Sequence, residues 1–130
     1  MKTHVEFKSD SFPAIEGEAD EVNPGRWGKN LAMFLHAELG GHGLETDNIY
    51  AEDWGWVIPI DYHEFPMFVG VGNYEEFPNG FLVFIDPSKP YIKKGFFKKI
   101  DTTKEIQNLA QALDAVLTQH SEIYDIRWWS

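Results

Sequence analysis

Side chains that could transfer protons gather in the middle of the chain, where Glu52, Asp53, Asp61, His63 and Glu64 stand close together in sequence. A carboxylate beside an imidazole can act as a general acid and base. Asp53 and His63 would be about 30 Å apart on one extended strand, so they can meet only across a turn or a neighbouring strand. Glu52, Asp53 and His63 are the catalytic candidates. The pattern favours the alternative, in which they are solvated charges at strand ends.

Residue spacing disfavours two other kinds of site, one for a metal ion and one for a nucleotide. His36, Glu38 and His42 are spaced i, i+2 and i+6, whereas a helix brings i and i+4 to one face. The His-Glu-x-x-His zinc motif is absent from the sequence. Gly70 and Gly72 lack the third glycine of a dinucleotide fingerprint. We therefore expect no metal site and no cofactor.

The stretch from 89 to 100 combines basic and aromatic residues in an otherwise acidic chain. Its binding candidates are four lysines and two phenylalanines: Lys93, Lys94, Phe96, Phe97, Lys98 and Lys99. One interpretation is a latch, in which Tyr91, Ile92 and both phenylalanines enter the core, because burying each phenylalanine gains about 1.5–3 kcal/mol. The other is a binding loop for an anionic partner, such as a nucleic acid, with rings free to stack. We favour the latch, because the charge of the whole chain disfavours phosphate.

The charge of the chain is strongly negative, with 21 acidic and 11 basic residues and a formal net charge of -10. Residues 1–80 hold 15 acids and four bases, whereas residues 81–130 hold six acids and seven bases. Such a surface repels nucleic-acid phosphate and suits a basic protein partner. The leading hypothesis is a non-enzymatic interaction protein, for example an immunity or antitoxin-like inhibitor. The alternative is a small enzyme or metabolite-binding protein that uses carboxylates and histidine at a sheet edge.

Composition also bears on domain count and compartment. A length of 130 residues fits one domain, 1–130. The sequence has no cysteine, which fits a reducing compartment. No segment resembles a signal peptide or approaches the roughly 20 apolar residues of a membrane span. We therefore expect a cytoplasmic protein with no membrane partner, and the sequence leaves the oligomeric state open.

The stretch from 51 to 62 organises the predicted fold. Trp54, Trp56, Ile58 and Ile60 recur at every second position, which is the pattern of a strand with one buried face. We predict that Trp54 and Trp56 are both buried under the helices, with Gly55 facing away. The alternative is that the two indoles line a ligand pocket.

Two amphipathic helices and six strands are predicted in all. The first helix, 24–40, follows the N-cap residue Asn23, and the second, 102–120, begins with a capping box of Thr102 and Glu105. Strands are predicted at 4–8, 45–50, 51–62, 67–74, 81–85 and 123–129, with a solvated acidic loop at 9–22. Short turns between consecutive strands make them antiparallel. The predicted fold class is α+β, a two-layer sandwich of order β-α-β-β-β-β-α-β with a mostly antiparallel sheet and both helices on one face.

Two short motifs suggest a relationship to other proteins. The combination of Ala-Glu-Asp-Trp-Gly-Trp at 51–56 with Asp-Pro-Ser-Lys-Pro at 86–90 resembles a group of small bacterial proteins of unassigned function. The resemblance covers most of the chain. It implies no catalytic residue that could be carried over to this sequence.

Overall fold

The fold is that of a computed structural model, which describes residues 1–22, 26–61, 64–73 and 77–130. The helices and strands have these bounds: β1 His4–Lys8, α1 Lys29–Gly41, β2 Tyr50–Glu52, β3 Gly55–Ile60, β4 Met67–Asn73, β5 Gly80–Asp86, β6 Tyr91–Lys94, β7 Lys98–Asp101, α2 Thr103–Gln119 and β8 Tyr124–Trp129. A short 3-10 turn, η1, spans Glu18–Asp20. None of the helices in the described ranges is long and apolar enough to cross a membrane.

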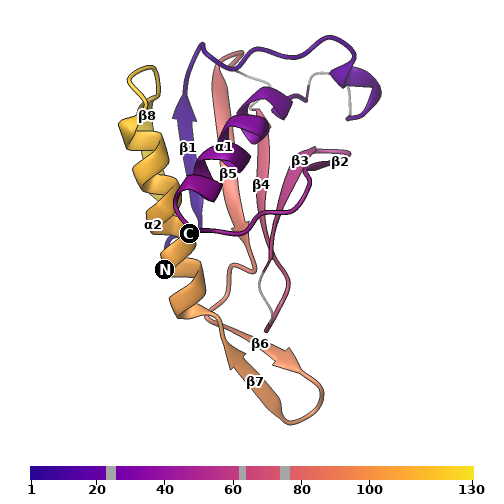
Figure 1. The fold of residues 1–130 in the computed structure, drawn as a ribbon, viewed down its shortest axis with the longest axis vertical. Helices are drawn as coiled ribbons and strands as arrows, with labels where there is room; N and C mark the ends of the chain where they lie inside the picture. The colour runs from indigo at the N-terminus through magenta and orange to yellow at the C-terminus, as the bar shows by residue number, and fades with distance from the viewer. Residues whose placement is uncertain (23–25, 62–63, 74–76) are drawn as a thin grey trace.

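Six of the strands form one antiparallel sheet in the order β2-β3-β4-β5-β1-β8. The first and last strands of the chain therefore lie side by side. Both helices cover the same face of this sheet, and β6 and β7 form a separate hairpin below it (Figure 1). The prediction of an α+β two-layer sandwich is confirmed, with the hairpin as an additional unit before α2.

The core lies between the helices and one face of the sheet. Alternate residues of each strand point into it, for example Trp56, Ile58 and Ile60 of β3. Each helix supplies leucines spaced four apart along one stripe: Leu31, Leu35 and Leu39 from α1, and Leu109, Leu113 and Leu117 from α2. One continuous cluster of buried apolar side chains joins both helices to the sheet. The periodicities of the sequence thus predicted the core faces correctly.

Element boundaries were predicted less well. Helix α1 has Gly28 as its N-cap, so the predicted start at 24 is wrong, and Asn23 lies outside the described residues. Of the predicted strand 45–50, only Thr46 makes a bridge outside β2. The predicted capping box of α2 is also wrong, because the hydroxyl of Thr102 donates a hydrogen bond to the carbonyl of Lys89 instead.

The prediction for the two tryptophans is correct for Trp56 and wrong for Trp54. Trp56 is 3% exposed in the core, whereas Trp54 is 37% exposed and contacts Phe84 on the opposite face of the sheet. The reason lies at Gly55, where an added Cβ would approach the carbonyl oxygen of Val71 to 2.3 Å. The strand begins only at this close contact. Trp54 belongs to the preceding turn, so the alternation of the sequence does not extend to it.

The loop at 9–22 is more than a solvated connection. Phe12 and Val22 are buried in the core cluster, and Phe12 contacts Phe34 of α1 with ring centroids 5.2 Å apart. Glu18, one of the acidic residues that suggested a solvated loop, is also buried. The prediction of a simple acidic loop is therefore wrong for these three positions.

Candidate functional site

The carboxylates that suggested acid–base chemistry lie along one edge of the sheet without converging. Glu52 faces Gly55 at the β2–β3 turn, beside the exposed Asp53. Asp61 follows the other end of β3, and the six residues of that strand separate it from the turn by about 20 Å. His63 lies outside the described residues. Among the described residues these carboxylates do not converge, and the acid–base pair with His63 stays a prediction.

The same holds for metal ligation. No group of three or more potential ligands from histidine, aspartate or glutamate is found in the part of the chain that the structure describes. His36 is half-buried on α1, whereas Glu38 and His42 are exposed. The i, i+2, i+6 spacing distributes these three side chains around the end of the helix rather than bringing them together.

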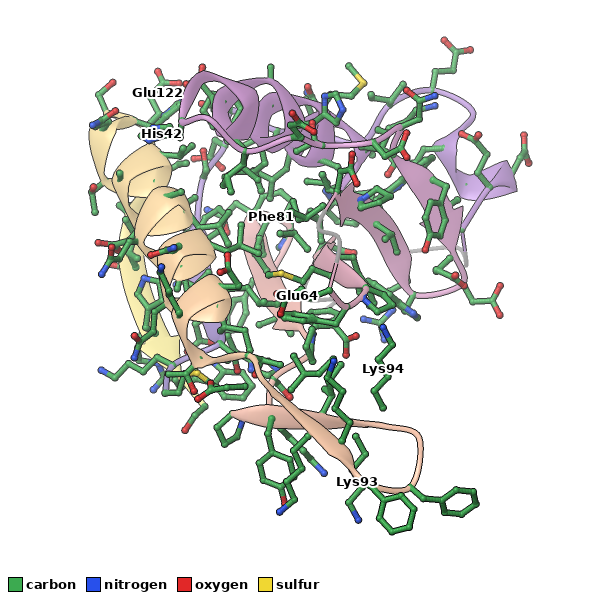
Figure 2. The ribbon with its side chains drawn as sticks, turned by 60° about the horizontal axis from the view of Figure 1, so that its bottom comes forward. His42, Glu64, Phe81, Lys93, Lys94 and Glu122 are labelled. Atoms are coloured by element: carbon green, nitrogen blue, oxygen red, sulfur yellow. The ribbon has the colours of Figure 1, made fainter. Side chains whose placement is uncertain are left out.

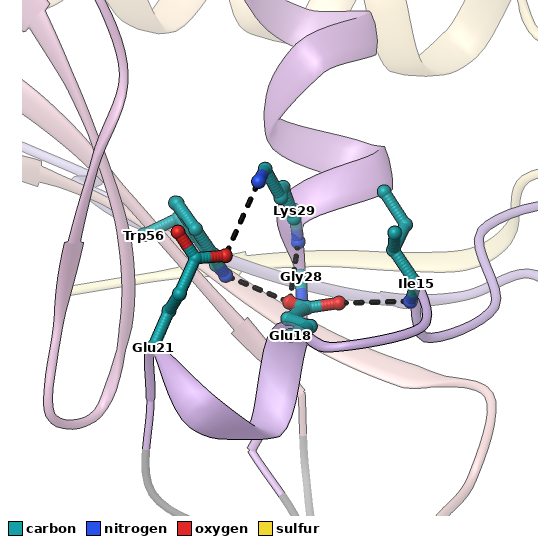
Figure 3. A network of polar contacts seen from close by, with 6 residues as sticks. All are labelled: Ile15, Glu18, Glu21, Gly28, Lys29 and Trp56. Carbon is teal, nitrogen blue, oxygen red and sulfur yellow. Dashed lines mark hydrogen bonds and ion pairs between the residues drawn. The ribbon is translucent and has the colours of Figure 1, made fainter.

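Glu18 carries the most heavily hydrogen-bonded carboxylate of the described residues, and it is only 2% exposed. Its Oε2 accepts hydrogen bonds from the backbone N–H groups of Gly28 and Lys29, each at 2.8 Å, and from the indole N–H of Trp56 at 2.7 Å (Figure 3). Its Oε1 accepts from the N–H of Ile15 at 3.0 Å. The carboxylate therefore caps the positive end of α1. Because donors of the chain itself occupy it, Glu18 has a structural role.

A row of rings runs across the face of the sheet that the helices leave open, which we call the open face. His4 stacks on Trp129 with centroids 4.5 Å apart and on Phe84 at 5.8 Å, and Trp54 contacts Phe84 at 5.2 Å. Phe84 lies over Gly70, where an added Cβ would approach its ring to 2.3 Å. A hollow of about 320 Å³ adjoins Trp54 and Phe84. The alternative prediction, in which both indoles line a ligand pocket, is therefore wrong for Trp56 and stays a prediction for Trp54, which lies beside this hollow.

The orientation of the rings limits what the open face can bind by stacking. The ring planes of His4 and its neighbours Phe84 and Trp129 are within about 22° of parallel. His4 stacks on Phe84 on one side and on Trp129 on the other, so both faces of its ring are covered. Burial lowers the pKa of His4 below its usual value, which favours the neutral imidazole in this row.

A second hollow of the open face, about 480 Å³ in volume, is lined largely by charged side chains. Those that carry charge are Glu6, Lys8, Asp125 and Arg127. Arg127 forms an ion pair with Glu6, and the ammonium of Lys8 lies 4.0 Å from the carboxylate of Asp125. These charges compensate one another, which gives the hollow no preference for a charged ligand.

The β6–β7 hairpin presents the most exposed apolar side chains of the described residues. It extends away from the sheet and helices, with Lys93 and Lys94 near its far end (Figures 1 and 2). Phe96 and Phe97 in its turn have exposed fractions of 99% and 101%. The latch interpretation, in which both rings enter the core, is therefore wrong. Gly95 begins the turn with a left-handed φ of 72°, which suits glycine.

The base of the hairpin, in contrast, is firmly attached. Ile92 and Ile100 face each other across the ladder, Ile100 is buried, and Ile92 packs against the core. The backbone N–H of Thr102 donates to the carbonyl of Pro90 at 2.9 Å. Asp101 accepts a hydrogen bond from the N–H of Thr103, and this bond lowers the pKa of Asp101. The hairpin thus has a fixed base and a free end.

The lysines of the hairpin stand in directly opposed like-charged pairs, Lys93 with Lys99 and Lys94 with Lys98. Like charges directly opposite each other destabilise a ladder. None of the four forms an ion pair with a described residue, and Lys99 instead lies 4.7 Å from the ring centroid of Tyr91. Because side chains alternate along a strand, one pair points to each face of the hairpin. We call these four lysines and the two phenylalanines of the turn the cationic tip.

The sequence contained a signal for this hairpin that the latch interpretation overlooked. The segment is nearly symmetric about a glycine-containing centre, as expected for two short strands joined by a turn: Lys93-Lys94-Gly95-Phe96-Phe97-Lys98-Lys99.

Comparison with known proteins adds no further guide to the site, because no family model, no curated protein and no solved structure matches the chain.

Proposed function

We propose that this chain is a non-enzymatic interaction protein and that the cationic tip is its principal contact with a partner. The observation that carries the proposal is the complete exposure of Phe96 and Phe97. Burying a phenylalanine gains about 1.5–3 kcal/mol, and in the isolated chain neither ring obtains this free energy. A partner that covers both rings would obtain it.

The construction of the hairpin supports this role. Its base is held by the Ile92–Ile100 pair and by the hydrogen bond from Thr102, so the backbone that carries the tip is preorganised. Preorganisation lowers the entropy lost on binding. The opposed lysine pairs are unfavourable in the free protein, and anionic groups of a partner would relieve their repulsion.

Site-specific photocross-linking in the source cells tests this proposal. We would place p-benzoylphenylalanine at position 97 and, as the matched control, at Met33, which is exposed on α1 far from the hairpin in sequence. The expected result is an adduct, with a protein or with a lipid, that forms from position 97 and not from position 33. Absence of any adduct specific to position 97 would contradict the proposal, since the expected contact is direct.

A second candidate function is the binding of a basic protein, such as the target of an immunity or antitoxin-like inhibitor. The segment 89–101 holds five lysines and one aspartate, which leaves 20 acids and six bases, a net of -14, in the rest of the chain. Exposed carboxylates follow the β2–β3 edge, at Glu45, Asp47, Glu52, Asp53, Asp61 and Glu64, and none pairs with a described base. A partner captured through this edge would bind less tightly as salt is raised.

The rival to both is a small enzyme or metabolite-binding protein that uses the carboxylates of the same edge. The separation of Asp53 from Asp61 along β3 disfavours it. A thermal shift caused by a metabolite, without any protein or membrane contact, would favour this rival.

A further inference from the structure

We infer that the cationic tip docks end-on to an anionic lipid bilayer, with Phe96 and Phe97 entering the interfacial region. The inference rests on the proposed function, because it names the class of partner that the tip contacts. Its first support is the arrangement of charge around the rings. The lysines occupy both faces of the hairpin, so cations surround the apolar end instead of forming a patch on one side.

Such an arrangement fits a planar anionic surface approached along the axis of the hairpin. The two rings are adjacent in the turn, with centroids 6.4 Å apart, and reach the surface together. The Lys94–Lys98 pair flanks the turn directly, and Lys93–Lys99 follows one residue, about 3.4 Å, farther back. Apolar groups of interfacial anchors enter about 5–10 Å, which leaves the ammonium groups of Lys94 and Lys98 at the level of the lipid headgroups, whereas that of Lys99 lies farther back over the ring of Tyr91.

The length of the hairpin keeps the acidic residues of the rest of the chain away from the anionic surface. Three residue steps, about 10 Å, separate Lys94 from Tyr91 at the base of the hairpin, whereas the Debye length at physiological salt is about 8 Å. The acidic remainder therefore lies about one screening length behind the Lys94–Lys98 pair. A short loop with the same residues would bring those carboxylates against the anionic headgroups.

The shape of the tip favours a bilayer over a nucleic acid. Proteins that bind single-stranded nucleic acids hold the phosphate backbone in a positively charged groove and stack successive bases on the faces of aromatic rings. Here the two exposed rings lie at the projecting end of a hairpin. The expectation of no membrane partner rested on the lack of a long apolar segment, which a tip of two side chains does not need.

Co-sedimentation with lipid vesicles tests the inference on the full chain. One set of vesicles contains phosphatidylcholine alone, and the other contains phosphatidylcholine mixed with phosphatidylglycerol. We expect binding to the mixed vesicles at low salt, weaker binding at physiological salt, and little binding to phosphatidylcholine alone. Absence of binding to the mixed vesicles, or equal binding to both sets, would overturn the inference.

Paired variants assign the binding to the tip. Phe96→Ser with Phe97→Ser should weaken vesicle binding by at least about tenfold without changing the melting temperature, and Phe→Trp at both positions should preserve binding. Lys94→Gln with Lys98→Gln should weaken it by about 25-fold, since each lysine near an anionic surface contributes about fivefold. Lys2→Gln with Lys104→Gln removes the same charge elsewhere and should change binding by less than about twofold.

Three further results would separate the role of the tip, the lipid partner and the proposed function from one another. Retention of vesicle binding by the doubly substituted serine variant would overturn the assignment to the tip. Phe96-dependent binding of a single-stranded oligonucleotide without vesicle binding would replace the bilayer with a nucleic acid. A protein adduct from position 97 combined with no vesicle binding would leave the proposed interaction function standing and refute only the lipid partner.

Discussion

A single carboxylate joins parts of the chain that are far apart in sequence. Glu18 lies in the loop before α1, yet it receives hydrogen bonds from the start of that helix and from the indole of Trp56 on β3. The sequence could not reveal this role, because Glu18 is one of several acidic residues in a stretch with turn-like composition. Only the path of the chain decides which of them reaches the helix end.

Glu18→Gln is expected to lower the free energy of unfolding by about 2–4 kcal/mol. Glutamine has one acceptor oxygen where glutamate has two, so its NH₂ group must face at least one of the four donors that now reach the carboxylate. Urea denaturation measures the change. Glu16→Gln is the control, since Glu16 is exposed and should give nearly the wild-type midpoint. Equal midpoints for both variants would contradict the capping role.

His4 should make stability depend on pH. Its pKa is lowered in the folded protein by burial, so the folded state binds fewer protons than the unfolded state in the interval below the usual value of 6.5. Stability is therefore full above pH 6.5 and is lost as the pH falls through the lowered pKa. Comparing denaturation midpoints at pH 7.5 and 5.5, we expect a smaller loss in His4→Phe than in wild type, whereas His42→Gln should keep the wild-type loss. A wild-type loss in both variants would exclude His4 as the cause.

At the scale of elements, the turn before β3 separates two tryptophans that the sequence groups together. Alternation predicts the burial of Trp56, Ile58 and Ile60, because a strand does continue through them. It fails at Trp54 because the strand begins only at the close contact between Gly55 and the carbonyl of Val71. Val71 belongs to the neighbouring strand, so the alternation of nearby residues cannot predict this contact.

The two tryptophans should therefore differ in their contribution to stability. Trp56→Ala should lower the free energy of unfolding by about 3–5 kcal/mol, because it opens a cavity in the core and removes a donor from Glu18. Trp54→Ala, which removes a partly exposed ring contact, should cost about 1 kcal/mol. Chemical denaturation of the two variants decides between this asymmetry and equal burial.

The hairpin is where a prediction from residue type alone, the burial of Phe96 and Phe97, is wrong. The high cost of exposing Phe96 and Phe97 argues for burial when a chain is considered alone, and that argument led to the latch. Under the proposed function that argument fails, because the chain presents these rings to a partner. The opposed lysine pairs break a local rule of sheet pairing without any gain inside the chain, and such breaks are expected at functional positions.

At the scale of the whole molecule, charge and apolar exposure divide between two units. The segment 89–101 is basic and ends in exposed rings, whereas the remainder is acidic and holds the continuous core. Because the two units share little beyond the base of the hairpin, the tip should be removable without loss of the fold.

Replacement of residues 93–99 by Asn-Gly tests this division. The sequence Asn-Gly favours a two-residue hairpin turn, and Ile92 and Ile100 already face each other two positions behind the Lys94–Lys98 pair, in the same class of ladder position. We expect the melting temperature to change by no more than a few degrees, since the core keeps both isoleucines. Cross-linking and vesicle binding should both be lost. Unfolding of this variant would show that the tip supports the fold, contrary to its exposure.

The fixed base and free end of the hairpin also bear on how this sequence can change over evolutionary time. Because both side chains are fully exposed, we expect substitutions at positions 96 and 97 to leave folding nearly unchanged. Two adjacent phenylalanines in water favour aggregation and would drift towards polar residues if nothing retained them. Under the proposed function a contact retains the pair, and the hairpin could be remodelled for a new target while the sandwich that carries it stays unchanged.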